Sequence, residues 1–390
     1  MNKKTIRDIE LSNKTILVRV DFNVPLLQGK VGDDTRIKAA LPTLNYLLQK
    51  DCKIIICTHL GRPGGIINKE FSLEHVATRL SELIGKPIGF AKDCIGPQTD
   101  TLKERLNSGD ILLLENTRFH AGEKKNDPDF CRNLTSKVDI FVNDAFGSAH
   151  RAHASTEGVA RILPAVAGLL MEKELLFLGS SVESPERPFV AILGGAKVSD
   201  KIGVIMNLLK KADLILIGGG MANTFFKSQG YPVGDSLVED SVLEMAREIL
   251  QKGNTSIRLP VDVKIADGFS ENANWQLIPS GPIPDGWRIL DIGPETVSSF
   301  GKVVQGSKMV VWNGPMGVFE FPEFSKGTFE IIKAIANSDS KSIIGGGESA
   351  AAVRQSGFTN KITHISTGGG ASLKMLEGKP LPGVAVLLDK

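Results

Sequence analysis

Residues 189–201 read FVAILGGAKVSDK, and this stretch is the starting point for the fold class. The apolar run Phe189–Leu193 is followed at once by two glycines and then by a polar segment with two lysines. Apolar runs without alternation are typical of strands that are buried on both faces of a parallel sheet. The stretch therefore predicts a buried strand that ends in a tight glycine loop, as strands do in open α/β sheets.

The same pattern recurs along the chain, where short apolar runs alternate with amphipathic segments of helical length. In the first half the predicted strands are Ile16–Val20, Ile54–Cys57, Ile111–Leu114 and Ile140–Val142. In the second half they are Phe189–Leu193, Leu214–Ile217, Ile289–Ile292, Met309–Trp312, Ile343–Ile344 and Ile362–Ile365. The segments 36–50 and 72–85 are typical of the intervening helices, and Ser72 and Gly85 are expected to bound the second. This alternation predicts an α/β protein with a doubly wound, Rossmann-like parallel sheet in each half.

The length of 390 residues predicts two domains, because it exceeds the size at which a single hydrophobic core stops growing. Residues 171–179 predict a helix, and 180–188 predict a polar loop with two prolines. We place the first domain at 1–170, an interdomain hinge helix and linker at 171–187, and the second domain at 188–378. Periodicity leaves the destination of the tail, 379–390, open.

Composition argues against several classes of function. A net charge of +2 with 23% charged residues gives no basis for nucleic-acid binding. The cysteines Cys52, Cys57, Cys94 and Cys131 form no C-x-x-C pair, and burial in a reducing cytosol is the preferred interpretation. The first 14 residues lack the apolar region of a secretory signal, and no apolar run approaches membrane-spanning length. We expect a cytoplasmic protein without nucleic-acid or membrane partners.

Basic side chains collect at the ends of the predicted strands in the first half. Ligands of open α/β sheets bind outside the carboxyl ends of strands, where this chain carries Arg36, His59, Arg62, Arg118 and Arg151. Guanidinium groups bind phosphate and carboxylate bidentately, and Asp21 and Asn23 would add contacts to a hydroxyl group. Each arginine alone is more simply a solvated surface residue, but five such positions favour a site for a small polyanion.

Two histidines in the segment AHRAHAS, His150 and His153, could form a metal pair. Structural or anion-contacting roles are preferred, because no third ligand is evident.

The second half carries three glycine triplets, 218–220, 345–347 and 368–370, each after an apolar run. Such loops expose backbone N–H groups that bind phosphate, although tight turns are the simpler explanation for any one triplet. No P-loop motif and no good G-x-G-x-x-G fingerprint is present, which counts against a nicotinamide-dependent dehydrogenase. Lys197 and Lys201 are expected to neutralise phosphate oxygens, with a solvent-facing helix lysine as the alternative. An anion-binding edge and a phosphate-binding edge together predict phosphoryl transfer.

These residues resemble the phosphoglycerate kinase family from end to end. The motifs RVDFNVP (19–25), THLGRP (58–63), LLENTRFH (113–120), NDAFGSAHRAHAST (143–156), LGGAKVSDKI (193–202), WNGPMGVFE (312–320) and STGGGASL (366–373) stand in the family's order. The resemblance implies two Rossmann-like domains, a monomer, and a C-terminal tail that returns to the first domain. It also implies a cytoplasmic enzyme of glycolysis and gluconeogenesis that moves a phosphoryl group between 1,3-bisphosphoglycerate and ADP when its domains close.

The resemblance implies a role for each residue that matches a family position. The first domain would bind 3-phosphoglycerate or 1,3-bisphosphoglycerate through Asp21, Phe22, Asn23, Arg36, His59, Leu60, Gly61, Arg62, Arg118 and Arg151. The second would bind the Mg²⁺ complex of ADP or ATP through Gly195, Lys201, Gly219, Gly220, Gly293, Asn313, Glu320, Gly346, Gly347, Glu348 and Ser349. Arg36, Lys197 and the Gly347 amide would stabilise the transferring phosphoryl group. The ionised carboxylate of 3-phosphoglycerate would attack the γ-phosphorus of ATP without a general base.

One position departs from the family pattern. Where the family usually has aspartate as its metal-contacting carboxylate, this chain has Glu348, in the sequence Gly345-Gly346-Gly347-Glu348-Ser349. The charge is kept, but the side chain is one methylene longer. The departure leaves a binding protein without catalysis as one alternative, and a dehydrogenase on a doubly wound fold is the other.

Overall fold

The computed structural model describes residues 2–390, with all their side chains except those of residues 180 and 182. The chain divides into two compact units. Unit 1 comprises Met1–Leu176 and Pro380–Lys390, and unit 2 comprises Phe177–Lys379. The division falls inside the segment 171–187 that we assigned to the hinge helix and linker.

Unit 1 is built on a six-stranded parallel sheet in the order β5-β6-β4-β1-β7-β8. Its strands are β1 (Thr15–Arg19), β4 (Lys53–Cys57), β5 (Gly89–Ala91), β6 (Ile111–Leu114), β7 (Ile140–Asn143) and β8 (Ala165–Ala167). A hairpin joins β2 (Leu26–Leu27) to β3 (Lys30–Val31). The central strands are buried along most of their length, which explains their uninterrupted apolar sequences.

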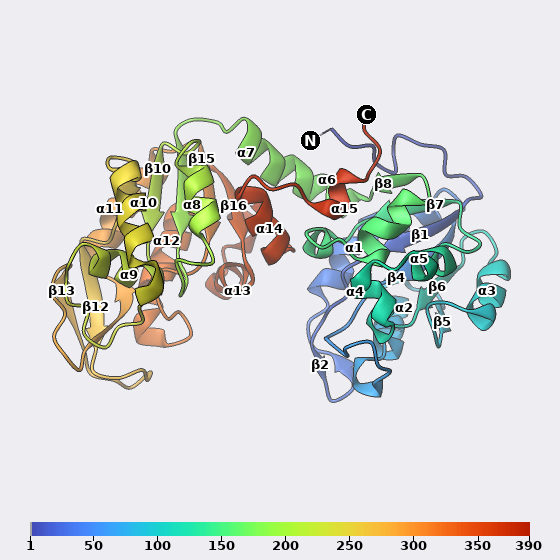
Figure 1. Cartoon of the computed structure of the whole chain (residues 1–390), viewed down its shortest axis with the longest axis horizontal. Helices are drawn as coiled ribbons and strands as arrows, with labels where there is room; N and C mark the ends of the chain where they lie inside the picture. Colours follow the sequence, from blue (N-terminus) through green and yellow to red (C-terminus); the bar gives the residue numbers. More distant parts are fainter. Residues whose placement is uncertain (1) are drawn as a thin grey trace. The chain divides into compact units, whose positions relative to one another are not determined.

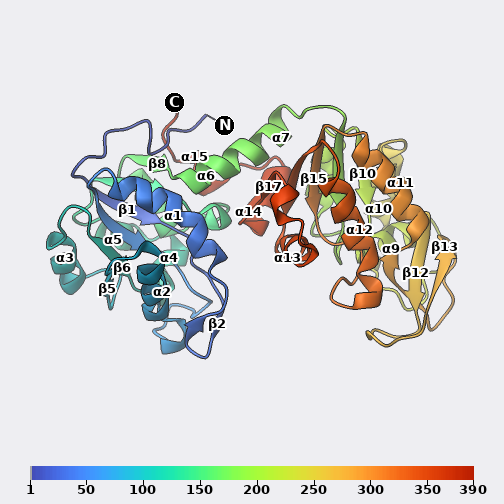
Figure 2. The ribbon, with the colours of Figure 1, turned by 180° about the vertical axis from the view of Figure 1, so that it is seen from behind.

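Helices cover both faces of this sheet (Figures 1 and 2). The views show α1 (Thr35–Leu48) and α2 (Glu74–Ile84) on one face, and α4 (Ala121–Lys125) and α5 (Pro128–Leu134) on the other. The remaining helices are α3 (Pro97–Glu104), α6 (Leu169–Glu174) and α15 (Pro382–Ala385). Gly85 ends α2 in the left-handed conformation, as predicted, whereas the N-cap is Leu73 rather than Ser72.

Unit 2 has a second six-stranded parallel sheet, in the order β11-β10-β9-β15-β16-β17. Its strands are β9 (Phe189–Leu193), β10 (Leu214–Ile217), β11 (Ile257–Arg258), β15 (Met309–Asn313), β16 (Lys341–Gly345) and β17 (His364–Ile365). Numbered within this sheet alone, the strand order is that of a Rossmann fold: successive strands are added on one side of β9 and then, from β15 on, on its other side. The prediction of two doubly wound α/β domains is thereby confirmed.

The helices of unit 2 also lie on both faces of its sheet. Figure 1 shows α8 (Ile202–Leu208), α9 (Gly220–Ser228) and α10 (Leu243–Gly253) in front of the strands. Figure 2 shows α11 (Pro294–Gln305) and α12 (Lys326–Ala336) in front from the opposite side. The unit is completed by α7 (Ser180–Glu183), α13 (Gly347–Ser356) and α14 (Gly369–Leu376).

Three predictions of local structure were wrong. Ile289–Ile292 belongs not to a parallel sheet but to a separate antiparallel one, in which β12 (Asp262–Ala266) pairs with β13 (Trp275–Pro279) and β14 (Arg288–Ile292). An apolar run does not reveal the direction of its partner, which explains the error. The predicted loop at 180–188 begins as helix α7, which follows the π-helical turn Leu175–Gly179. Strand β17 is shorter than predicted, because residues 362 and 363 form a bend between the 3₁₀ turn Thr359–Lys361 and the strand.

Candidate active site

The basic edge of unit 1 is organised around the carboxylate of Asp21, in the loop after β1. Arg36 at the start of α1 donates a hydrogen bond from Nη1 to Asp21 Oδ1 over 3.0 Å. Ser148, which follows β7, donates to Asp21 Oδ2 over 3.3 Å. Burial opposes ionisation of Asp21, but the surrounding positive charges, including those of Arg36 and Arg19, hold its pKa below the usual value. Asp21 is therefore an anion that the cationic edge keeps in place.

His59, in the loop after β4, is held in one tautomer by a buried arginine. Arg19 is the last residue of β1 and is 1% exposed. Its Nη2 lies 2.9 Å from His59 Nδ1, so this ring nitrogen must act as the acceptor. Burial, together with the charges of Arg19, Arg118 and Arg36, lowers the pKa of His59 well below 6.5. His59 is thus a neutral imidazole whose Nε2–H is the available donor.

The remaining predicted arginines differ in burial. Arg118 is 6% exposed and donates from Nη1 to the Gly61 carbonyl over 2.7 Å, while its Nε is buried without a hydrogen-bond partner. Burial and the charges of Arg19 and Arg151 lower the pKa of Arg118 to about 10, which leaves it charged at neutral pH. Arg151 is exposed. Arg62 is also exposed and, among the described residues, makes no hydrogen bond or ion pair with the rest of the edge.

Two predicted substrate residues, Phe22 and Leu60, already have partners within the protein. The Phe22 side chain is fully buried, and the Phe22 N–H donates to Thr58 Oγ1 over 2.9 Å. Leu60 is also buried, and its N–H and carbonyl both bond to the Asn116 carboxamide. These residues shape the loops from inside and offer no free group to a ligand. Asn23 is exposed and accepts the Gly61 N–H over 2.9 Å, which ties two loops of the edge together.

Among the described residues, His150 and His153 belong to no group of three possible metal ligands. His150 Nε2 accepts a hydrogen bond from Arg151 Nε over 3.0 Å. Burial and nearby arginines lower the pKa of His153 to about 4. A different trio, Asp93, Cys94 and His120, brings possible ligand atoms within 4.8 Å of one another. However, Asp93 Oδ1 already accepts from His120 Nε2 over 2.7 Å, and burial raises the pKa of the Cys94 thiol well above 9, so we assign it no ion.

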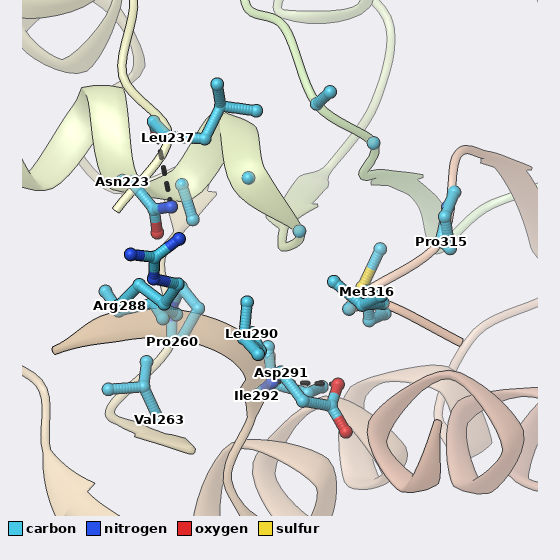
Figure 3. Close-up of a pocket in the computed structure, with 18 of the residues that line it drawn as sticks. Asn223, Leu237, Pro260, Val263, Arg288, Leu290, Asp291, Ile292, Pro315 and Met316 are labelled. Atoms are coloured by element: carbon cyan, nitrogen blue, oxygen red, sulfur yellow. Dashed lines mark hydrogen bonds between the residues drawn. The ribbon is translucent and has the colours of Figure 1, made fainter. Parts of the chain in front are cut away.

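The glycine-rich edge of unit 2 forms a pocket of about 450 Å³ at the carboxyl ends of the strands. Loops that follow β9, β10 and β15 line one side of it, and β14 and the segment before β12 line the other (Figure 3). The predicted residues Gly195, Gly219, Gly220, Glu320 and Glu348 are all part of the lining. The pocket lies beside strands β9 and β15, between which the strand order reverses. Doubly wound sheets bind nucleotides at this point.

Two glycines of this edge are required by the backbone. Gly219 has a φ of +66°, and a Cβ atom there would lie 2.7 Å from the Gly195 nitrogen. Gly346 has a φ of +97° and caps helix α13, whose first residue is Gly347. Gly347 is exposed and has open space where a Cβ would project. The first turn of α13 therefore presents unobstructed backbone N–H groups, a preferred binding site for phosphate.

Lys201 is buried, so the alternative of a solvent-facing helix lysine was wrong. Its side chain is 8% exposed, and Nζ donates to Asn313 Oδ1 over 2.7 Å and to the Asn313 carbonyl over 3.3 Å. Burial lowers the pKa of Lys201 to about 8, against the opposing charges of Glu348 and Asp200. Asn313 Nδ2 is buried without a hydrogen-bond partner. The pair thus offers an ammonium group and a free amide donor next to the glycine loops.

Glu348 and Lys197 are both exposed at this edge. Glu348 is in the first turn of α13, lines the pocket, and makes no hydrogen bond or ion pair among the described residues. A free carboxylate beside a phosphate-binding helix N-terminus fits a Mg²⁺ ion that is bound mainly by phosphates and water. Lys197 follows the Gly194-Gly195 turn and lies close enough to Glu239 to lower its pKa.

Two predicted nucleotide residues have other partners. Gly293 does not line the pocket; its N–H donates to the Asp262 carbonyl over 2.9 Å, and a Cβ there would collide with the Asp262 carboxylate. The Ser349 hydroxyl accepts the Gly314 N–H over 2.7 Å and so supports the loop after β15. Glycine is therefore needed at position 293 because the Asp262 side chain packs against it at the start of α11. Ser349 holds the backbone of the loop after β15 and does not line the pocket.

Sequence reasoning did not single out several residues that the structure brings into the two edges. Arg19 lies within an apolar run of the sequence. Charged residues are rarely buried unless they are paired, so an arginine in a predicted buried strand could have indicated a functional group. Other residues that line the pocket come from scattered segments: Asn223, Leu237, Pro260, Val263, Phe269, Arg288, Ile289 and Leu290. No local pattern joins these residues, so only the tertiary structure identifies them.

Comparison with known proteins gives a consistent result. A family model described as phosphoglycerate kinase matches residues 6–379. Phosphoglycerate kinases from Moorella thermoacetica and Herpetosiphon aurantiacus are 53% and 56% identical to the chain, over the full length of both partners in each case.

Solved structures lead to the same family. The phosphoglycerate kinase of Coxiella burnetii matches with a TM-score of 0.91 at 40% identity, and that of Pyrococcus horikoshii with 0.86 at 37%. Each comparison covers 98% of both chains. Within residues 2–390, none of the helices combines the length and apolar character needed to cross a membrane. From the full-length matches, the two parallel sheets and their edges, this chain belongs to the phosphoglycerate kinase family.

Proposed function

We propose that the two edges divide the family's reaction between them. The reaction is the reversible transfer of a phosphoryl group between 1,3-bisphosphoglycerate and ADP, which gives 3-phosphoglycerate and ATP in glycolysis. In this proposal unit 1 binds the phosphoglycerate and unit 2 binds the nucleotide. The observation that carries the proposal is the cluster of Arg36, Arg19, Arg118 and Arg151 around Asp21 and His59, because so many cations need an anionic ligand.

On the substrate side, each group has a role that follows from its chemistry. Arg118 and Arg151 bind the 3-phosphate, and Arg62 adds a flexible contact from the rim. Asp21 and Asn23 accept and donate hydrogen bonds at the 2-hydroxyl. The neutral His59 donates from Nε2 to a carboxylate or phosphate oxygen, while Gly61 and the buried Phe22 and Leu60 hold the loops in shape.

On the nucleotide side, backbone amides of the glycine loops bind phosphate oxygens. Lys201 and Asn313 Nδ2 lie behind these loops and add a positive charge and a donor. Glu320 is exposed at the pocket, where its carboxylate can accept hydrogen bonds from ribose hydroxyls. Glu348 would hold Mg²⁺, which when bound neutralises phosphate charge and orients the phosphate chain.

The chemistry requires positioning and charge neutralisation rather than a base. The carboxylate of 3-phosphoglycerate is ionised at neutral pH and can attack the γ-phosphorus of ATP directly. Arg36, Lys197 and the Gly347 amide would stabilise the charge of the group in transfer. In the reverse direction the acyl phosphate gives up its phosphoryl group to ADP, and the carboxylate leaves without needing a proton.

The domain boundaries, oligomeric state and compartment are further parts of the proposal. We assign 1–170 and 379–390 to phosphoglycerate binding, 171–187 to a hinge and 188–378 to nucleotide binding. A monomer in the cytoplasm is supported by two observations. One chain supplies both edges, and all four cysteines are free and buried, as suits a reducing compartment.

A coupled assay with 3-phosphoglycerate and MgATP tests the division of labour. Arg118→Ala should raise KM for 3-phosphoglycerate and leave KM for ATP nearly unchanged, since the two sites are on different units. Lys201→Ala should raise KM for ATP and leave KM for 3-phosphoglycerate nearly unchanged. If either variant changed only the KM of the substrate assigned to the other unit, the assignment of the edges would be wrong.

A further inference from the structure

A buried carboxylate is connected to the arginine edge of unit 1 but takes no part in the proposed contacts to substrate. Glu123, on the short helix α4, is fully buried, and both of its oxygens accept hydrogen bonds from Ser155. The Ser155 N–H donates to Oε2 over 3.0 Å, and the Ser155 hydroxyl donates to Oε1 over 2.7 Å. Ser155 is itself fully buried, in the π-helical turn Ala154–Gly158. The carboxylate therefore fixes the direction in which the Ser155 hydroxyl points its hydrogen.

The oxygen of that hydroxyl keeps its lone pairs for a second partner, Arg19 at the end of β1. Arg19 Nε donates to Ser155 Oγ over 2.8 Å, and Nη1 donates to the Val20 carbonyl. Its third nitrogen, Nη2, lies 2.9 Å from His59 Nδ1. The bonds at Nε and Nη1 hold the guanidinium plane, and so they fix the direction of Nη2. A chain of hydrogen bonds thus runs from Glu123 through Ser155 and Arg19 to His59.

The same chain joins two opposite charges that make no direct contact. Within the described part of the chain no ion pair joins Arg19 to a carboxylate, and Glu123 has only the ring of His153, whose Nδ1 lies 3.9 Å from Oε1. The pKa of His153 is lowered to about 4, mainly by burial, so at neutral pH this ring does not balance the charge of Glu123. A buried charge is costly unless it is paired and hydrogen-bonded, and the Ser155 hydroxyl is the group that bonds to both charges.

We propose that Glu123 and Ser155 are positioning residues for the substrate site, acting through Arg19 on His59. Arg19 has no acceptor atom, so while it faces Nδ1 the proton of the neutral ring stays on Nε2. His59 then presents the same donor to each substrate molecule. Without the carboxylate, the Ser155 hydroxyl is free to rotate and Arg19 loses the charge that balances it, so Nη2 no longer fixes the tautomer. This inference rests on the proposed phosphoglycerate site in unit 1.

Two variants interrupt the chain at different points. Glu123→Gln keeps the size of the side chain, but one carboxamide oxygen cannot replace two carboxylate oxygens, so either the N–H or the hydroxyl of Ser155 faces an amino group. Ser155→Ala removes the hydroxyl alone. Each variant should raise KM for 3-phosphoglycerate by about 10-fold. The kcat and the KM for ATP should stay nearly unchanged, because the weakened contact holds substrate equally before and during transfer and belongs to unit 1.

The tautomer of His59 supplies a readout that a purely structural role would not change. Long-range ¹H–¹⁵N spectra at neutral pH should show a protonated Nε2 and an unprotonated Nδ1 in the unmodified enzyme. His59→Gln identifies the signal among those of the six histidines. In Glu123→Gln and Ser155→Ala the tautomer that is protonated at Nδ1 should also appear.

Glu157→Gln is the matched control. Glu157 is a buried carboxylate of the same π-helical turn, but its partners are Asn126 and Arg161 rather than the chain that leads to His59. The control should leave both the KM for 3-phosphoglycerate and the tautomer of His59 unchanged. If it raised KM as much as the two test variants do, disturbance of the turn would be the cause and the positioning role would be wrong.

The remaining outcomes separate the positioning role from the site itself. Thermal melting identifies which variants are folded, and Ser155→Ala keeps the test valid if burial makes Glu123→Gln unstable. Folded variants with an unchanged KM for 3-phosphoglycerate, or with the tautomer of the unmodified enzyme, would overturn the positioning role. If Arg118→Ala raises that KM while these variants do not, only the positioning role fails. If Arg118→Ala also leaves it unchanged, the phosphoglycerate site in unit 1 is wrong as well.

Discussion

At the scale of single residues, burial decides what two lysines of one loop can do. Lys201 is buried against Asn313, and the resulting loss of hydration lowers its pKa to about 8. It remains mostly charged at neutral pH but cannot move far from the glycine loops. Lys197 is exposed and has the freedom to follow a phosphoryl group during transfer. Lys201 is therefore suited to binding, and Lys197 to the transition state.

The first prediction concerns Lys197→Ala, which should mainly lower kcat. Losing one electrostatic donor to a transition state reduces the rate by roughly 10²–10³-fold. Steady-state kinetics with 3-phosphoglycerate and MgATP measures the effect, and Lys302→Ala at another exposed lysine of unit 2 is the control. A kcat within a few-fold of the unmodified enzyme with a raised KM would make Lys197 a binding residue only.

The second prediction concerns Glu348, where we expect an active enzyme with an altered metal requirement. Mg²⁺ demands near-ideal octahedral geometry, and a glutamate must give up an additional rotatable bond to meet it. Glu348→Asp should lower the Mg²⁺ concentration for half-maximal rate, and Glu348→Ala should raise it. The KM for 3-phosphoglycerate should change little.

A matched control exists for this metal titration. Glu295 is exposed and is the second residue of α11, as Glu348 is of α13, so Glu295→Asp reproduces the change at an equivalent helix position. It should leave the Mg²⁺ titration unchanged. If Glu348→Asp and Glu348→Ala also left it unchanged, Glu348 would not contact the metal.

At the scale of elements, a buried carboxylate connects strand β7 to helix α6. Asp144 follows β7, and its Oδ1 accepts the N–H groups of Leu170 and Met171 over 2.9 and 3.2 Å. These are donors in the first turn of α6, which the helix itself leaves unsatisfied. Burial raises the pKa of Asp144 from 3.8 to about 6 despite these hydrogen bonds.

The third prediction is that Asp144→Asn flattens the pH dependence of stability. Between pH 4 and pH 6 the folded Asp144 retains a proton that the unfolded chain has released. The contribution of Asp144 to the free energy of unfolding is therefore greatest below the pKa it has in the unfolded chain. This contribution is lost as the pH rises through the pKa of the folded state. Asparagine keeps the acceptor without titrating, so the variant should be more stable by about 3 kcal/mol at pH 7 and similar at pH 4.

Urea unfolding at pH 4, 5, 6 and 7 measures this difference. Asp285→Asn, at an exposed position, is the control and should leave the pH profile unchanged. Parallel profiles for the unmodified enzyme and Asp144→Asn would show that Asp144 does not couple protonation to folding.

At the scale of the whole molecule, the proposed function assigns the two substrates to different units. Each unit has its own sheet and its own ligand edge. Direct transfer requires that the acceptor carboxylate and the γ-phosphate meet with water excluded. If each substrate binds only its assigned unit, both substrates are needed to favour a closed state.

The fourth prediction is that the enzyme becomes more compact only with both substrates bound. Small-angle scattering should give a smaller radius of gyration in the ternary complex than in the free enzyme or in either binary complex. A catalytically inert ATP analogue with 3-phosphoglycerate keeps the complex intact during measurement. The same radius in all four states would contradict closure.

The sequence by itself determined the fold class, the family and most of the loops to which we assign substrate binding. Strand runs such as Phe189–Leu193 were predicted with their observed bounds, because burial on both faces leaves a continuous apolar signature. The loop positions followed, since ligand groups in these folds come directly after the strands. Asp21, Arg36 and His59 could therefore be named without coordinates.

Only the tertiary structure decided which of those groups are available to a ligand. Leu60 and Ser349 are committed to Asn116 and Gly314, Gly293 packs against Asp262, and Lys201 is buried. The antiparallel direction of β14 and the connection from Glu123 through Ser155 to Arg19 were equally hidden. The physical reason is that periodicity reports how each segment faces the core, whereas burial and hydrogen-bond partners depend on residues that are distant in sequence.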